Sequence, residues 1–358
     1  MVKVEHLEKY QYGKNVTIIN QDEKENFNMK NNKNNYGAGN NGSRRFLMAN
    51  GTLQTMSVFA DTVRSVVDSY LGKAYQVRLQ QVTKNNGVTL TGLIIKNQES
   101  NLAPTIYLDA FYERYVAGER MAELCLEIIQ LQENNKKTED FDTSLITDFS
   151  KVSSRICYKL VNAERNRELL AEVPHKRFHD LAIIFYILVS QETTATATIT
   201  VRNNLQELWG VGEDELFALA LQNTQRFFRG SVLSMENLFF EVAEELDAEE
   251  TMAFYDMVVE DDGIISMYIA STQDRVNGAG IVFYDGLLQQ FAESIQSDFY
   301  LLPSSIHEMI FVPATIGLSV AELKQIVADM NADKVAPEEV LSNHVYYYSR
   351  VLDRVDIL

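Results

Sequence analysis

The nine-residue stretch 181–189, LAIIFYILV, decides how this chain folds. It is the longest uninterrupted apolar run among the 358 residues of the sequence. An apolar run of this length, without polar alternation, is typical of a strand that is buried on both faces. The β-branched segment 195–201 follows a polar stretch at 191–194, so we predict that the two segments pair as a hairpin.

Other strands and helices are predicted on either side of this hairpin. The Asn-Gly pair at 86–87 is the strongest short-range hairpin signal in the chain. The predicted strands are 75–82, 88–95, 104–109, 156–161, 264–270, 279–284, 299–302, 306–312, 344–349 and 354–357. The predicted helices are 53–71, 121–129, 213–226, 235–246, 252–259, 287–295 and a last one opened by a Ser319/Glu322 capping box.

Strands come mostly as hairpins that are separated by single helices, and this order predicts the fold class. The sequence indicates an α+β fold with a mainly antiparallel sheet rather than a doubly wound parallel one. Pro303-Ser304-Ser305 is predicted to join strands 299–302 and 306–312. The Asn277-Gly278 pair is predicted as the turn between strands 264–270 and 279–284.

Composition predicts a tail and two lobes. Residues 26–41 hold eight asparagines and almost no apolar residue, so 1–51 is predicted to be a disordered tail with a short isolated strand near 16–19. A polar stretch at 132–142 separates an N-terminal α+β lobe, 52–142, from a C-terminal α+β lobe, 143–358. The candidate start residues are Met1, Met48 and Met56.

The charge of the chain excludes some partners and suggests others. Fifty acids against 32 bases give a net charge of -18, which disfavours binding to a nucleic-acid backbone or to an anionic membrane surface. Residues 231–274 contain twelve acids and no Lys or Arg. One interpretation is a solvated helical surface that keeps the protein soluble. The other is that helices in this stretch present an acidic face to a protein partner, such as a basic one. The face comprises Glu241, Glu244, Glu245, Glu249 and Glu250.

Cysteine usage and hydropathy predict the compartment. The two cysteines, Cys125 and Cys157, lack metal-ligand or redox spacing and are expected to be reduced and mostly buried. No apolar run reaches the length of a membrane span, and the first twenty residues hold no apolar core of a secretion signal. We therefore expect a cytoplasmic protein without a membrane segment.

Two histidines follow Pro174. If that proline opens a helical turn, His175 and His179 share one face, as metal-binding pairs do, and Asp180 could orient one of them. The sequence supplies no third ligand, so no metal site is predicted. The glycines at 37–42 fit G-x-G-x-x-G but lie inside the asparagine tract, so no cofactor is predicted.

A second polar group lies at the start of the predicted strand 306–312. It comprises Ser304, Ser305, His307 and Glu308. Both faces of the strand are apolar, so burying these ionisable groups without partners costs several kcal/mol. One interpretation is a hydrogen-bonded knot that fixes the hairpin. The other is a ligand or catalytic site that also includes His175 and His179.

Four motifs carry a resemblance to a known family. They are APTIYLD at 103–109, VPHKRFHDLAIIF at 173–185, LPSSIHE at 302–308 and LSNHVYYYSR at 341–350. With their order and spacing, the chain resembles an uncharacterised bacterial family, a domain of unknown function found in anaerobic gut-type bacteria, over residues 53–358. The resemblance implies a soluble, cytoplasmic bacterial protein and no particular activity. The second half is also similar to a second uncharacterised family.

Three functional hypotheses follow. The first is a non-enzymatic binding or regulatory protein that uses the acidic helical face, because no strong catalytic signature is present. The alternative is a hydrolase or ligand-binding enzyme centred on His307 and Glu308 with His175 and His179. A second alternative is an acidic mimic of nucleic acid, which requires the acids to form one continuous exposed stripe.

Overall fold

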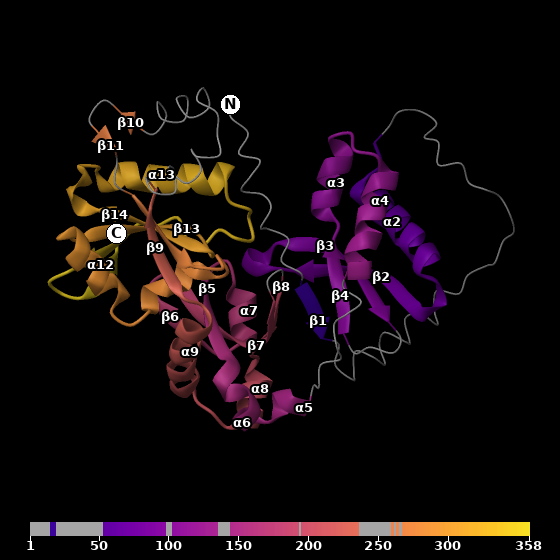
Figure 1. Cartoon of the computed structure of the whole chain (residues 1–358), viewed down its shortest axis with the longest axis horizontal. Coiled ribbons are helices and arrows are strands. Elements are labelled where there is room, and N and C mark those ends of the chain that lie inside the picture. The colour runs from indigo at the N-terminus through magenta and orange to yellow at the C-terminus, as the bar shows by residue number, and fades with distance from the viewer. Residues whose placement is uncertain are drawn as a thin grey trace, which may run out of the picture. The chain divides into compact units, whose positions relative to one another are not determined.

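The computed structural model describes residues 15–18, 53–97, 102–134, 144–192, 195–235, 259–260, 263–264 and 267–358 (Figure 1). Among these residues, every strand pair with a defined register is antiparallel. Helices are interspersed between the strands along the chain. The predicted α+β fold with a mainly antiparallel sheet is therefore confirmed.

Contacts divide the chain into two compact units. Unit 1 comprises Met1–Thr83, Thr89–Ile146 and Leu188–Ile199, and unit 2 comprises Lys84–Val88, Thr147–Ile187 and Thr200–Leu358. The turn Lys84–Val88 therefore belongs to unit 2, although the strands that it joins belong to unit 1. The lobes predicted at 52–142 and 143–358 stay a prediction.

Unit 1 contains a four-stranded sheet in the order β1-β4-β3-β2. Its strands are β1 (Asn15–Ile18), β2 (Tyr75–Thr83), β3 (Thr89–Asn97) and β4 (Leu102–Tyr107). The short strand predicted inside the tail is therefore not isolated, because β1 pairs with β4 at the edge of the sheet. The rest of the predicted tail, up to residue 51, lies outside the described residues.

Helices α2 (Met56–Leu71), α3 (Asp109–Val116) and α4 (Met121–Asn134) form the apolar core of unit 1 with this sheet, and Figure 1 shows them grouped beside it. Phe59, Val63 and Val67 recur at i+4 along α2, so they share one face and are fully buried. They pack with residues of β3 such as Leu93. Burial of each such side chain contributes about 2 kcal/mol.

The β2–β3 turn follows the sequence prediction. Asn86 and Gly87 both have positive φ, 60° and 71°, inside the short 3-10 helix η3 (Asn85–Gly87). Asparagine and glycine tolerate this left-handed conformation better than other residues do. The local sequence therefore predicts the position of this turn correctly.

The strand around which the prediction was built is β7 (Leu181–Glu192), which belongs to unit 2 as far as Ile187 and to unit 1 from Leu188. In its sheet, β7 lies between β5 (Ile156–Asn162) and β6 (His175–Phe178), and it also pairs with β8 (Ala195–Thr200). Residues 181–188 are at most 3% exposed. The prediction of a strand buried on both faces is confirmed.

A six-stranded sheet, in the order β16-β15-β13-β14-β12-β9, forms the rest of the β-structure described in unit 2, apart from the short pair β10–β11. Its strands are β9 (Gly230–Ser234), β12 (Tyr268–Thr272), β13 (Phe299–Ser305), β14 (Glu308–Pro313), β15 (Tyr346–Ser349) and β16 (Arg354–Ile357). Helix α13 (Val320–Asp333) packs on one face, where Leu302 meets Leu323 and Val327 (Figure 1). The predicted Ser319/Glu322 capping box at its start is confirmed.

The opposite face of this sheet carries aromatic side chains. Phe299 and Phe311 lie with their ring centroids 4.9 Å apart, and both contact Phe291 of α12 (Leu287–Ile295). Alternate residues of a strand point to opposite faces of the sheet. A helix covers each face, α13 on one side and α12 on the other, and β13 and β14 are therefore apolar on both sides.

The remaining described elements are short, apart from α9. They are α5 (Ser144–Thr147), α6 (Phe149–Val152), α7 (Arg167–Glu172), α8 (Asn203–Trp209), α9 (Glu213–Phe227), β10 (Val259–Glu260), β11 (Gly263–Ile264), and the 3-10 helices η2 (Gly72–Ala74), η4 (Ser153–Arg155), η5 (Gly278–Phe283) and η6 (Ala314–Ile316). None of the described helices combines the length and the apolar character that crossing a membrane needs. The helices predicted at 235–246 and 252–259 lie almost entirely outside the described residues.

One predicted strand is wrong. Residues 279–284 were expected to be extended, but Gly278–Phe283 form the 3-10 helix η5. The backbone of η5 is satisfied by side chains, since the buried Tyr158 hydroxyl donates to the Gly280 carbonyl over 2.7 Å. A Cβ atom on Gly278 would lie 2.3 Å from the His307 carbonyl oxygen, so only glycine allows this close approach.

The predicted turn of LPSSIHE is also wrong by two residues. Pro303, Ser304 and Ser305 belong to β13, and the chain reverses at Ile306 and His307. The register shifts between Leu302 and Ser305, and such an irregularity accommodates a proline that has no N–H to donate. The Ser305 hydroxyl then accepts the backbone N–H of His307 over 3.0 Å, which stabilises the later turn.

Asp298, which directly precedes β13, ties down the terminal hairpin β15–β16. Tyr347 donates its hydroxyl to Asp298 over 2.6 Å, and the Arg350 N–H donates to the other carboxylate oxygen over 2.9 Å. The hydrogen bond to Asp298 raises the pKa of Tyr347 from 10.0 to about 12. The Tyr347 hydroxyl in turn holds the pKa of Asp298 below its usual 3.8.

This hydrogen bond predicts a pH-dependent contribution to stability. The unfolded chain releases the Tyr347 proton near pH 10, whereas the folded chain keeps it to about pH 12. The stabilisation is therefore complete below pH 10 and is lost as the pH rises to about 12. We expect Tyr347→Phe to lower the free energy of unfolding by about 1 kcal/mol at pH 8, and by progressively less above pH 10, in urea titrations. Asp298→Asn should shift the Tyr347 titration back toward pH 10. If the loss of unfolding free energy in Tyr347→Phe stays constant up to pH 12, the role assigned to this hydrogen bond is wrong.

Candidate functional site

The tight turn between β6 and β7 starts the candidate site. Phe178 pairs with Leu181, so His179 and Asp180 alone make the turn. His179 has a positive φ of 53°, which costs a residue with a Cβ roughly 1 kcal/mol. Both turn residues make contacts to the C-terminal segment, and these contacts oppose that cost.

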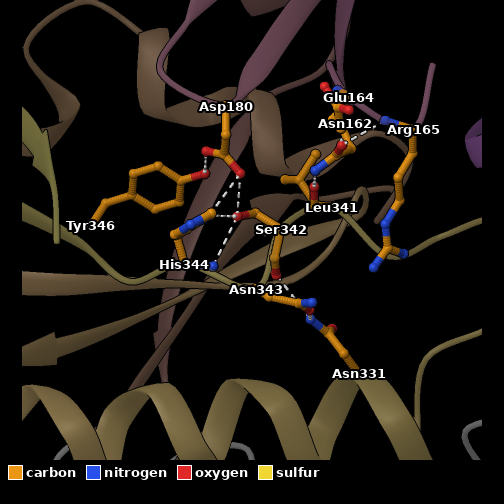
Figure 2. Close-up of polar contacts among 10 residues, drawn as sticks. All are labelled: Asn162, Glu164, Arg165, Asp180, Asn331, Leu341, Ser342, Asn343, His344 and Tyr346. Atoms are coloured by element: carbon orange, nitrogen blue, oxygen red, sulfur yellow. Dashed lines mark hydrogen bonds and ion pairs between the residues drawn. The ribbon is translucent and has the colours of Figure 1, made fainter. Parts of the chain in front are cut away.

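Asp180 is the acceptor at the centre of a polar cluster (Figure 2). One carboxylate oxygen accepts the Tyr346 hydroxyl over 2.6 Å. The other oxygen accepts the Ser342 hydroxyl over 2.6 Å and lies 3.1 Å from Nδ1 of His344. The Ser342 hydroxyl also accepts the backbone N–H of His344 over 2.9 Å. Three side chains of one segment thus converge on a carboxylate from a distant turn.

The cluster determines the tautomer of His344. A carboxylate only accepts hydrogen bonds, so the proton of a neutral His344 lies on Nδ1 and the lone pair lies on Nε2. The side chain of His344 is 51% exposed, and its Nε2 atom makes no hydrogen bond or ion pair in the part of the chain that the structure describes. An imidazole of this kind has the chemistry of a general base.

The same cluster does not have the geometry of a Ser-His-Asp triad. Ser342 is 1% exposed and lies 3.4 Å from Nδ1 of His344, whereas a triad serine is activated by Nε2. Burial, reinforced by the charge of Asp180, raises the pKa of Tyr346 well above its usual value of 10.0, so Tyr346 stays a neutral donor. The pair Asp180–His344 is therefore a dyad without a built-in nucleophile.

Asparagine side chains hold the segment that carries Ser342 and His344 (Figure 2). Asn162 of β5 donates to the Leu341 carbonyl over 3.0 Å, and its own side-chain oxygen accepts two backbone N–H groups, from Glu164 and Arg165. Asn331 of α13 donates to the Ser342 carbonyl over 2.8 Å. The segment is thus fixed by side chains from both its neighbours, a strand and a helix.

The helical turn that the sequence suggested after Pro174 is absent, because His175–Phe178 form β6. Nδ1 of His175 lies 3.1 Å from the Val173 carbonyl, and Nε2 of His179 lies 3.0 Å from the Val355 carbonyl. Neither ring contacts His307. Within the described ranges, no group of three potential ligands is placed to hold a metal ion.

His307 lies in the β13–β14 turn and is fixed on several sides. Its Nδ1 accepts the Asn277 backbone N–H over 3.2 Å, so the ring hydrogen of the neutral form lies on Nε2, 3.4 Å from the Glu339 carboxylate. The Ser304 hydroxyl donates to Glu308 over 3.3 Å. These contacts fix the turn, and each of the side chains of Ser304, Ser305, His307 and Glu308 has a partner within the protein.

The other residues that the sequence analysis singled out are either buried or outside the described residues. Cys125 and Cys157 are free and buried, and burial raises the pKa of Cys157 to about 12, so its thiol stays protonated. The predicted acidic face lies outside the described residues. It comprises Glu241, Glu244, Glu245, Glu249 and Glu250.

Sequence reasoning missed the cluster itself. Ser342, His344 and Tyr346 alternate along the chain, and alternation places side chains on one side of an extended segment, so a local signal was present. Asp180 was considered only as an orienting partner for the preceding histidines. Nothing local connects it with residues that follow more than 160 positions later.

The cluster predicts a large effect of Asp180 on stability. Asp180→Ala leaves the buried hydroxyls of Ser342 and Tyr346 without an acceptor, so we expect the free energy of unfolding to fall by about 3 kcal/mol. Tyr346→Phe removes only one bond, and the double variant should cost less than the sum of both single changes. Urea unfolding measures all three variants. Asp356→Ala, on the edge strand β16, serves as control, because its side chain is 42% exposed and pairs with the exposed Arg354. Equal losses in Asp180→Ala and Asp356→Ala would contradict the role of the cluster.

Comparison with known proteins assigns the chain to a family. A search of curated proteins and a search of solved structures each found no match. A family model described as a family of unknown function (DUF5688) matches residues 56–350, which is most of the chain and includes the whole Asp180 cluster. This agrees with the resemblance to an uncharacterised family that the four motifs carry. The chain belongs to the family of unknown function DUF5688.

Proposed function

We propose that this chain is a non-enzymatic binding protein that contacts a basic protein partner through its acid-rich segment. The observation that supports this proposal most strongly is the charge of residues 231–274, which hold twelve acids and no Lys or Arg. Crowded carboxylates repel one another, and a positively charged partner relieves that repulsion and accelerates association.

The attachment of the segment supports this proposal. Strands β9 and β12 pair with each other, and the Met235 N–H donates to the Met267 carbonyl over 2.8 Å. Residues 236–266, called the insertion below, therefore connect two adjacent positions of the β9–β12 hairpin, Met235 and Met267. β9 is also the last strand of its sheet, so the insertion begins at a sheet edge.

Hydrogen bonds within the protein that already occupy other polar groups also support a binding role. The hydroxyls of Ser304, Ser305 and Ser342 are each held by hydrogen bonds within the protein. The rings of His175 and His307 are likewise held. A hydrolase needs a nucleophile or water-activating group that is accessible to its substrate, and these groups serve the fold instead.

Charge reversal tests the proposed surface. Replacing Glu241, Glu244, Glu245 and Glu249 by Lys should abolish capture of a defined partner from an extract of the native cells. The control reverses four exposed acids elsewhere: Glu168, Glu207, Asp329 and Asp333. We expect the control to retain the partner, and the wild-type affinity to fall steeply with salt in titrations with the purified partner. Full retention of every partner by the first variant would overturn the proposal.

The same experiment distinguishes a protein that binds a basic partner from a mimic of nucleic acid. A mimic would capture a nucleic-acid-binding protein, and duplex DNA would compete for it. A second variant with residues 236–266 replaced by an Asn-Gly turn keeps the β9–β12 pairing and should fold. Its loss of the partner, with an unchanged unfolding midpoint for the rest of the chain, assigns binding to the insertion.

A hydrolytic function is the second candidate, and one observation favours it. Its best-placed imidazole is that of His344, which pairs with Asp180 and exposes Nε2, rather than His307 with Glu308. If His344 acts as a general base, His344→Gln should lower the rate of p-nitrophenyl acetate hydrolysis by about 100-fold. His175→Gln is the control, since its ring contacts the Val173 carbonyl. Equal rates for both variants and the wild type would eliminate this candidate.

A further inference from the structure

The turn η3 carries an asparagine whose side chain is bonded through both its nitrogen and its oxygen. The amide nitrogen of Asn86 donates to the carbonyls of Pro337 and Val340, over 2.9 and 2.7 Å. Its side-chain oxygen accepts the Asn166 amide over 3.0 Å, and its backbone N–H donates to the Asn166 oxygen over 2.9 Å. All four residues belong to unit 2, so these contacts lie within that unit.

These bonds fasten an irregular segment of the chain. The neighbouring Asn85 donates to the Glu338 carbonyl over 2.6 Å, between the two carbonyls that the next asparagine holds. Residues 337–340 lead directly to Ser342 and His344 of the polar cluster. The turn η3 therefore holds the chain just before that cluster.

The residue that follows Asn86 makes it chemically labile. An asparagine loses its amide when the backbone nitrogen of the next residue attacks its Cγ atom, and a glycine, which has no Cβ, obstructs this attack least. A new C–N bond closes a succinimide ring, the bond from Cγ to the amide nitrogen breaks, and ammonia leaves with the proton of the attacking nitrogen. Water then opens the ring and yields aspartate or isoaspartate. Water is the only co-reactant.

The folded turn prevents this ring closure. Asn86 has a ψ of 21°, which places the Gly87 nitrogen on the side of the Cα–C bond away from the Asn86 Cβ. The ring closes only after the backbone rotates about ψ and the side-chain amide leaves its partners. Gly87 is exposed, and a Cβ added there would meet no atom within 4 Å, so the turn has room to open locally.

We propose that Asn86 is a deamidation site: local opening of η3 lets water convert its side chain to a carboxylate, and this conversion releases residues 337–340. A carboxylate only accepts hydrogen bonds, so it cannot donate to the carbonyls of Pro337 and Val340, and its charge repels their oxygens. The product cannot form the original contacts again. The covalent change is thus a one-way switch on the segment that precedes the polar cluster.

A second Asn-Gly pair among the described residues is the matched control. Asn277 has φ 50° and ψ 29°, close to the conformation of Asn86. Gly278, however, is buried, and a Cβ there would lie 2.3 Å from the His307 carbonyl oxygen. Opening at Asn277 therefore requires the buried helix η5 to unfold.

Incubation of the full chain in ¹⁸O-labelled water at mildly alkaline pH tests the site. Trypsin releases Asn86 in the peptide 85–96, and mass spectrometry measures the conversion of its amide to a labelled carboxyl group. We expect Asn86 to react faster than Asn277 in the folded chain, and the two to react at similar rates in urea. Asn86→Gln should not react at this rate, because its longer side chain does not form the succinimide ring.

Loss of the anchoring asparagine separates local from global opening. Asn166→Ala removes the partner of the Asn86 N–H and of its side-chain oxygen, so the reaction at Asn86 should accelerate about tenfold or more. The rate at Asn277 in the same molecules reports global unfolding and should stay unchanged.

Hydrogen exchange measures the release of the segment. Asn86→Asp has the side chain of the product, so we expect the amides of residues 337–346 to exchange about tenfold faster than in the wild type. The amides of β7 should exchange as in the wild type, which shows that the variant is folded.

The proposal fails on any of three results. Equal rates at Asn86 and Asn277 in the folded chain would mean that no local opening exposes Asn86. Equal acceleration of both sites by Asn166→Ala would assign the reaction to global unfolding. Wild-type exchange of residues 337–346 in Asn86→Asp would remove the switch.

Discussion

The carboxylate of Asp180 is the interaction on which the architecture of unit 2 depends. It belongs to a turn of the sheet built on β7, and its three donors belong to the segment that leads into β15 of the other sheet. An ionised acceptor with hydroxyl and imidazole donors makes hydrogen bonds roughly twice as strong as neutral ones. A single side chain thereby joins two sheets that have no strand in common.

Other short polar side chains of unit 2 also join distant segments by hydrogen bonds. Asn162 and Asn331 hold the carbonyls of Leu341 and Ser342, while Asn86 donates to the carbonyls of Pro337 and Val340. Buried backbone groups in an irregular segment need such partners, because no neighbouring strand supplies them. The segment that precedes β15 is therefore as well fixed as a strand, although it contains no regular structure.

The segment on which the proposed function rests joins this framework at a sheet edge. The acid-rich stretch 231–274 begins in β9, the last strand of its sheet, and ends after β12, with which β9 pairs. The stretch thus starts and ends on two paired strands of the six-stranded sheet.

The amino-acid sequence by itself determined the features whose causes are local. The β2–β3 turn follows from Asn86-Gly87, the start of α13 from Ser319 and Glu322, and the buried strand β7 from an apolar run that tolerates no solvent. Tertiary structure decided the rest. Residues 279–284 look like a strand, but Gly278 and Gly280 meet side chains and backbone from distant segments and form η5. The Asp180 cluster likewise joins residues more than 160 positions apart, and no local pattern encodes which carboxylate a hydroxyl will find when both are buried.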